Sequence, residues 1–128
     1  MTDYILIVDD NPDVRMLLTD AITMLGLQVK TAEHGKEALE WIAKETPKLI
    51  VLDLMMPIMD GFTTLTNLQK TKEGRKIPVI LLSAIADPHN KNQNLPGVVG
   101  IMKKGDFSLD KLRAMLKKVG VLGVGAVL

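Results

Sequence analysis

Two stretches decide the fold of this chain: Ile5-Leu6-Ile7-Val8-Asp9-Asp10 and Leu49-Ile50-Val51-Leu52-Asp53. Each begins with a run of branched apolar residues that does not alternate with polar ones, which is typical of strands buried on both faces of a parallel sheet. An aspartate directly follows each run. In open α/β sheets, ligands bind at the edge where the carboxyl ends of the strands meet. We therefore expect Asp9, Asp10 and Asp53 to lie together at one edge of a sheet.

Three neighbouring carboxylates need an explanation, because each pair repels by roughly 1 kcal/mol even at the dielectric constant of water. Such a cluster is stable only if a group is protonated or a cation lies among the acids. All-oxygen ligation with an open position favours a hard ion such as Mg²⁺. The alternative is that Asp9, Asp10 and Asp53 are helix caps and loop acids. It accounts for any one of them but not for the placement of all three.

Apolar runs alternate with amphipathic segments along the whole chain. Strands are expected at Tyr4–Val8, Gln28–Ala32, Leu49–Leu52, Val79–Leu82 and Gly100–Met102, and helices from Pro12 to Leu25, Gly35 to Glu45, Phe62 to Gln69, and after Ser108. Between Ala86 and Val99, Pro88, Pro96 and several Asn residues predict a short or irregular fourth helix. The pattern predicts an α/β fold, a doubly wound five-stranded parallel sheet with helices on both faces.

Length and composition bound the function. The 128 residues predict one domain, residues 1–120, followed by an uncharged tail, residues 121–128, whose role the sequence leaves open. A net charge of +1 and few aromatic residues argue against nucleic-acid binding by this domain. There is no cysteine, so disulfides and thiolate metal sites are excluded. The first residues do not resemble a secretory signal, so we expect a cytoplasmic protein with no membrane contact.

Four pieces of the sequence together resemble a known family. They are Val8-Asp9-Asp10, the segment Asp53-Leu54-Met55-Met56-Pro57-Ile58-Met59-Asp60-Gly61, Ser83-Ala84 and a lysine after the fifth expected strand. In this order and spacing they resemble the receiver domain of bacterial two-component response regulators, from about Tyr4 to Val119. The resemblance implies a flavodoxin-like strand order, 2-1-3-4-5, which is described for a chemotaxis member of that family.

The resemblance also implies a role for each site residue. Asp53 would accept a phosphoryl group from a histidine kinase or a histidine phosphotransfer protein, with Mg²⁺ as cofactor. The Mg²⁺ ligands would be Asp10 directly, Asp9 largely through water, Asp53, and the backbone carbonyl of Met55. Ser83 and Lys104 would stabilise the phosphoryl group, and Lys103 is the competitor of Lys104. Pro57, Asp60 and Gly61 would shape the loop beyond Asp53, with Asp60 capping the third helix.

Three departures from the family pattern concern the residues that would pass on the signal after phosphorylation. Ile101 stands where the family usually has an aromatic switch residue, and Gly105 stands where a proline usually follows the lysine. The weak segment from Ala86 to Val99 lies on the face that many receivers use for dimerisation or output. We expect phosphate acceptance to survive these changes. Phosphorylation-dependent dimerisation, and a separate or missing output domain, are left open.

Two other functions compete with a phosphoacceptor. A phosphohydrolase with an aspartate nucleophile needs an acid two residues after the nucleophile, and Met55 stands there. A phosphate-independent docking module would usually have lost the acidic pair or the acceptor, and both are present. We therefore expect a signalling switch that catalyses only its own phosphoryl transfer and dephosphorylation. His34 and His89 are expected to be solvated loop histidines.

Overall fold

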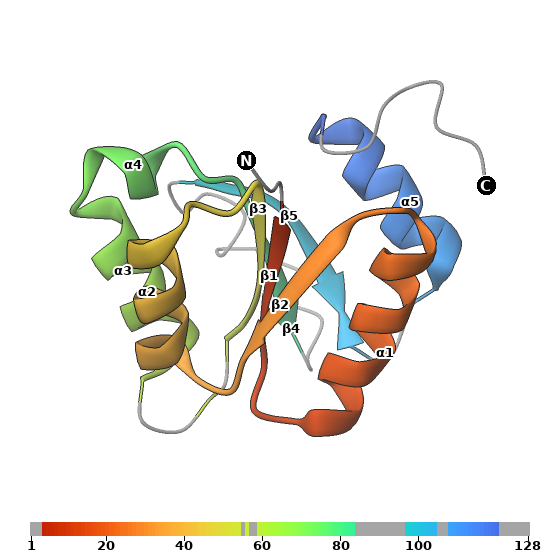
Figure 1. Cartoon of the computed structure of the whole chain (residues 1–128), viewed down its shortest axis with the longest axis horizontal. Helices are drawn as coiled ribbons and strands as arrows, with labels where there is room; N and C mark the ends of the chain where they lie inside the picture. The colour runs from red at the N-terminus through yellow and green to blue at the C-terminus, as the bar shows by residue number, and fades with distance from the viewer. Residues whose placement is uncertain (1–3, 55, 57–58, 84–96, 105–107, 121–128) are drawn as a thin grey trace.

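A computed structural model describes residues 4–54, 56, 59–83, 97–104 and 108–120 (Figure 1). The elements in chain order are β1 (Tyr4–Val8), α1 (Pro12–Met24), β2 (Gln28–Ala32), α2 (Gly35–Lys44), β3 (Leu49–Asp53), α3 (Gly61–Gln69), α4 (Lys72–Arg75), β4 (Val79–Ser83), β5 (Val98–Lys103) and α5 (Leu109–Lys118). Strands and helices thus alternate through most of the chain, as the sequence predicts.

The five strands form one parallel sheet in the order β2-β1-β3-β4-β5, which confirms the doubly wound fold. In the register, Val8 on β1 faces Ala32 on β2 and Leu52 on β3, and Asp53 faces Leu82 on β4. The carboxyl ends of the central strands therefore reach the same edge. This alignment positions the acids that follow β1 and end β3.

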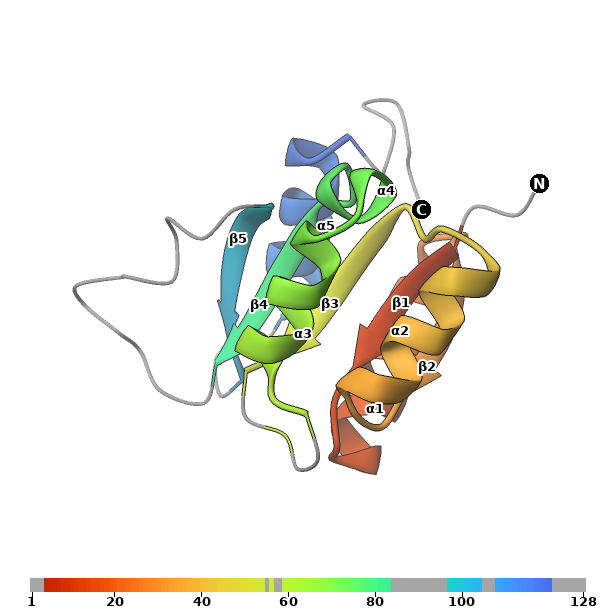
Figure 2. The same cartoon turned by 90° about the vertical axis from the view of Figure 1, so that its left-hand side faces the viewer.

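Helices cover both faces of the sheet: α1 and α5 lie on one side, and α2 and α3 on the other (Figures 1 and 2). Alternate strand residues supply the two cores. Ile5 and Ile7 pack with α1 and α5, whereas Leu6 and Val8 belong to the core under α2 and α3. Every residue of β1 and β3 is buried, which explains why both runs lack polar alternation.

Side-chain caps fix where the helices begin. Asn11 caps α1 and Ser108 caps α5, as their positions in the sequence predict. Asp60 is the N-cap of α3, and its carboxylate accepts a hydrogen bond from the backbone N–H of Thr63 at 2.7 Å. His34 lies in the turn between β2 and α2, as expected, but it is only partly exposed and has a structural role. It caps α2, where its Nδ1 accepts a hydrogen bond from the N–H of Glu37 at 3.2 Å.

Two parts of the architecture differ from the expectation. β5 begins at Val98, so Val98 and Val99 belong to the sheet and not to the irregular segment; backbone pairing of Val98 with Val79 decides this. The four-residue helix α4 was not predicted, because it contains Gly74 and is too short to show a period. The expected fourth helix, within residues 84–96, lies outside the described residues, as do His89 and residues 121–128 of the tail.

No helix in the described part of the chain has both the length and the apolar character that crossing a membrane requires.

Candidate functional site

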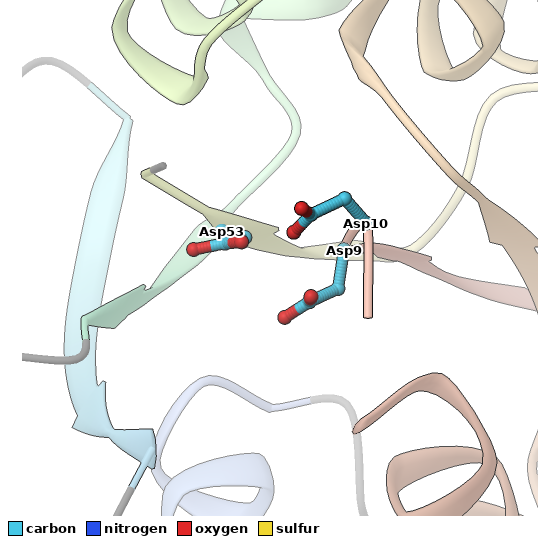
Figure 3. A group of neighbouring side chains, drawn as sticks. All are labelled: Asp9, Asp10 and Asp53. Atoms are coloured by element: carbon cyan, nitrogen blue, oxygen red, sulfur yellow. The ribbon is translucent and has the colours of Figure 1, made fainter. Parts of the chain in front are cut away.

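Three carboxylates meet at the carboxyl edge of the two central strands (Figure 3). Asp9 and Asp10 directly follow β1, and Asp53 is the last residue of the neighbouring β3. Each offers one oxygen, and these oxygens all lie within 4.8 Å of one another. Asp9 and Asp53 are 0% and 1% exposed, whereas Asp10 is open to solvent. The cluster therefore has two buried acids and one at its mouth.

Asp9 is held by several groups at once. Its backbone N–H donates to the carbonyl of Ala32 on β2 at 3.1 Å. Its Oδ1 accepts from the backbone N–H of Asn11 at 2.9 Å, and its Oδ2 lies 3.0 Å from the Nζ of Lys104. Both oxygens thus have partners. The Asp9 carboxylate has little freedom to turn toward a bound ion.

Lys104 supplies the positive charge of the cluster. Its Nζ lies 3.0 Å from the Oδ2 of Asp53 and at the same distance from the Oδ2 of Asp9. Burial lowers the pKa of Lys104, but the hydrogen bonds and charges of Asp53 and Asp9 together outweigh it, so the pKa is raised. The ion pairs therefore stabilise the fold fully below about pH 10, and that contribution is lost as the pH rises through the raised pKa.

Lys103 has a different position from Lys104. It is the exposed last residue of β5, and its backbone pairs with Ser83 at the end of β4. Successive residues of a strand point to opposite faces of the sheet, so Lys103 and Lys104 cannot both turn to Asp53. The structure brings Lys104 to the acids.

Arg15 is a residue of this region that the sequence analysis missed. It lies on α1, its Nη1 donates to the backbone carbonyl of Asp9 at 2.7 Å, and its Nη2 lies 3.5 Å from the Oε1 of Glu33. The guanidinium therefore links the turn after β1 to the turn after β2. The only sequence signal was a lone arginine near the start of the helix that follows the acidic pair.

The backbone beyond Asp53 folds back tightly onto the strand end. The N–H of Gly61 donates to the carbonyl of Leu54 at 3.1 Å, and a Cβ on Gly61 would lie 2.4 Å from the carbonyl oxygen of Asp53. Only glycine fits such an approach. The pKa of Asp60 is lowered, chiefly by its hydrogen bond from the N–H of Thr63, so the cap stays ionised.

Two other candidate residues lie on β4 and β5. Ser83 ends β4 at the same edge as Asp53, and Ile101 lies half-buried on β5 against the core under α2 and α3. Met55 and Pro57 lie outside the described residues.

The donor set fits a hard divalent cation. Three carboxylates and one ammonium leave an excess of negative charge at an edge that is open on the Asp10 side. All three acids offer oxygen, which suits Mg²⁺ and not a soft metal.

Fold and site define a flavodoxin-like α/β domain with an acidic cluster at the carboxyl edge of its sheet. The family model of the response regulator receiver domain matches residues 5–117. The probable transcriptional regulator ycf27 of Porphyra purpurea is 41% identical over 117 residues, which are 91% of this chain and 47% of that protein. The chain thus spans about half the length of this curated relative.

Solved structures agree. The chemotaxis protein CheY4 of Vibrio cholerae superposes with a TM-score of 0.84 at 27% identity, covering 93% of this chain and 99% of that one. The signal receiver domain of a histidine kinase from Syntrophus aciditrophicus gives a TM-score of 0.81 at 30% identity, covering 99% and 96%. This chain belongs to the response regulator receiver domain family of two-component signalling. The resemblance read from the sequence is confirmed.

Proposed function

We propose that this receiver is a phosphoacceptor switch in which Asp53 takes a phosphoryl group from the phosphohistidine of a histidine kinase or a histidine phosphotransfer protein. One observation carries the proposal. Asp53 is fixed at the end of a buried strand, paired with Lys104 at 3.0 Å, and its carboxylate lies in one cluster with those of Asp9 and Asp10. This arrangement holds a nucleophile, a cation for the phosphoryl oxygens, and ligands for a metal in one place.

The transfer needs a nucleophilic oxygen in a fixed position. An oxygen of Asp53 attacks the phosphorus, a P–O bond forms, the P–N bond of the phosphohistidine breaks, and its electron pair stays on the imidazole nitrogen. Lys104 then pairs with the phosphoryl group in place of the free carboxylate, and the Ser83 hydroxyl donates to a phosphoryl oxygen. The ammonium of Lys104 already lies beside Asp53, so it can stabilise the charge of the phosphoryl group with little movement.

Mg²⁺ would be held by Asp10 and Asp53 directly, by Asp9 through water, and by the backbone carbonyl of Met55. Bound there, the ion would screen Asp53 from the incoming phosphoryl oxygens. Asp9 suits a role through water because both of its oxygens already have partners, Asn11 and Lys104.

The signal is passed on by a change of conformation, to a further domain or to a separate partner. Ile101 replaces the aromatic reporter, so an aromatic rotamer is not the switch. We infer that the chain acts in the cytoplasm and catalyses only its own phosphorylation and dephosphorylation.

Incubation with acetyl phosphate and Mg²⁺, followed by intact mass measurement, tests the function. We expect one phosphoryl adduct that requires Mg²⁺, forms on Asp53 and is absent in Asp53→Asn. An adduct on another residue, or no adduct with acetyl phosphate and with a phosphorylated histidine phosphotransfer protein, would contradict the proposal.

A further inference from the structure

We propose that Arg15 is a positioning residue for the metal site, acting through the peptide bond between Asp9 and Asp10. The inference rests on the proposed function, because it concerns the ligands through which this receiver would hold Mg²⁺. It assigns to Arg15 a role that neither the acidic cluster nor the phosphoryl-binding residues perform.

The decisive contact is the one between the guanidinium and the main chain. The Nη1 of Arg15 donates to the carbonyl oxygen of Asp9 at 2.7 Å, which is a short, charge-assisted hydrogen bond. The side chain of Arg15 is 16% exposed, so the bond is largely shielded from water. The second contact, to Glu33, is 3.5 Å long, and the Glu33 side chain is 66% exposed. An exposed pair of this kind contributes little.

The Asp9 carbonyl and the Asp10 N–H belong to one planar peptide group. The N–H of Asp9 is already fixed on the other side by the carbonyl of Ala32. That N–H belongs to the preceding peptide group. The Asp9–Asp10 group is restrained through its own carbonyl by Arg15, and this restraint orients the Asp10 side chain. Asp10 depends on this restraint more than Asp9 does, because Asp10 is exposed whereas Asp9 is buried and held by Asn11 and Lys104.

Charge and positioning predict opposite effects of removing the guanidinium. A positive group near the cluster repels a divalent cation, so its loss alone should strengthen Mg²⁺ binding. Loss of a group that orients a metal ligand weakens metal binding, typically by about 10- to 100-fold. The sign of the change in Mg²⁺ affinity therefore shows whether Arg15 acts mainly through its charge or by positioning a ligand.

The test compares Mg²⁺ affinity, measured by calorimetry on the whole chain, in wild type, Arg15→Met, Arg15→Lys and the control Glu33→Gln. Arg15→Met keeps the aliphatic stem but has neither the charge nor the donors. We expect it to bind Mg²⁺ about tenfold more weakly. Glu33→Gln, which leaves the bond to Asp9 intact, should stay within about twofold of wild type. The thermal midpoint of metal-free Glu33→Gln should change little, whereas that of Arg15→Met should fall, because it loses a shielded, charge-assisted hydrogen bond. Phosphorylation of Arg15→Met should recover at saturating Mg²⁺.

Equal or tighter Mg²⁺ binding by Arg15→Met would overturn the proposal. If Arg15→Met does not fold, Arg15→Lys decides, since its ammonium keeps the charge but lies one bond short of the position of Nη1. Weaker Mg²⁺ binding then supports positioning, and wild-type affinity overturns it. A wild-type protein that binds Mg²⁺ but forms no adduct on Asp53 would contradict the proposed function and leave the Arg15 result standing. A wild type that binds no Mg²⁺ would overturn both.

Discussion

The centre of the sheet and its β5 edge are built differently. β1 and β3 are buried along their whole length and pair without interruption, and they carry Asp9 and Asp53. β5 pairs with β4 through a register shift opposite Val79 and Ile80, most of its residues are partly exposed, and it leads into Lys104. β5 lies at the edge of the sheet, beside β4 (Figure 2). The acids therefore come from the most regular part of the fold, and the cation that pairs with them follows an irregular edge strand.

Under the proposed function, this difference would assign phosphoryl transfer to the central strands and signal passage to β5. A nucleophile must be held in place, and a strand buried on both faces provides that restraint. A switch needs an element with two arrangements whose balance the phosphoryl group changes. An edge strand with a register shift is better suited to that role than a central one. Lys104 follows β5 and contacts Asp53, so phosphorylation of Asp53, as proposed above, would act on β5 directly.

The largest expected effect is that of removing the cation. Lys104→Ala leaves two buried carboxylates without their shared partner, so we expect the metal-free protein to lose about 3 kcal/mol of unfolding free energy. Lys103→Ala, the matched control, should change it by less than about 0.5 kcal/mol. Urea denaturation measures both. Added Mg²⁺ should restore more stability to Lys104→Ala than it adds to wild type. If the two variants lose equal stability, Lys104 does not hold the cluster together.

Two glycine substitutions compare the rigidity of the two regions. A Cβ at Gly61 would meet backbone atoms, at 2.4 Å from the Asp53 oxygen and 2.8 Å from the Leu54 Cα, so Gly61→Ala should cost about 2 kcal/mol. At Gly100 on β5 the nearest atom is the side-chain sulfur of Met115 at 3.0 Å, which can move away. Gly100→Ala should therefore cost less than about 1 kcal/mol. Thermal unfolding of both variants measures these losses of stability. A larger loss of stability in Gly100→Ala would mean that β5 is the less adaptable region.

A smaller effect on stability is expected from substitution of Asp10, the exposed acid of the cluster. Asp10→Asn weakens the attraction for Mg²⁺ but also relieves repulsion among the acids. The metal-free thermal midpoint should stay equal or rise slightly, while Mg²⁺ affinity falls. Calorimetric titration and thermal unfolding without metal measure the two quantities. A marked fall in metal-free stability would reveal a structural role for Asp10.

The only tyrosine of the chain reports on the centre of the sheet at alkaline pH. Burial of Tyr4 on β1, and then the charge of Glu45, raise its pKa to about 12. The neutral phenol is favoured in the folded state, so this contribution to stability is complete below about pH 10 and is lost as the pH rises toward 12. Ultraviolet absorbance of the phenolate should show a midpoint near 12 in the folded protein. A midpoint near 10 without unfolding would mean that this end of β1 is open to water.

The sequence by itself determined the fold class, the strand order through family resemblance, and most element boundaries. Runs such as Ile5–Val8 are typical of strands buried on both faces of a parallel sheet, and residues such as Asn11 and Ser108 mark helix starts through local hydrogen bonds. These signals are local, so they can be read without knowing the partners. The acids that follow β1 and end β3 could also be placed at one edge, because parallel strands align their carboxyl ends.

The family resemblance already favoured Lys104 over Lys103, but only the tertiary structure shows how Lys104 and Arg15 contact these acids. Asp9, Asp53 and Lys104 are far apart in the chain, and their 3.0 Å contacts depend on the register of β5, which a shift near Val79 sets and no local pattern shows. The same reason hid Arg15: its partner is a backbone carbonyl, which carries no side-chain identity in the sequence. Contacts between distant residues, or with the main chain, become visible only when packing has brought the partners together.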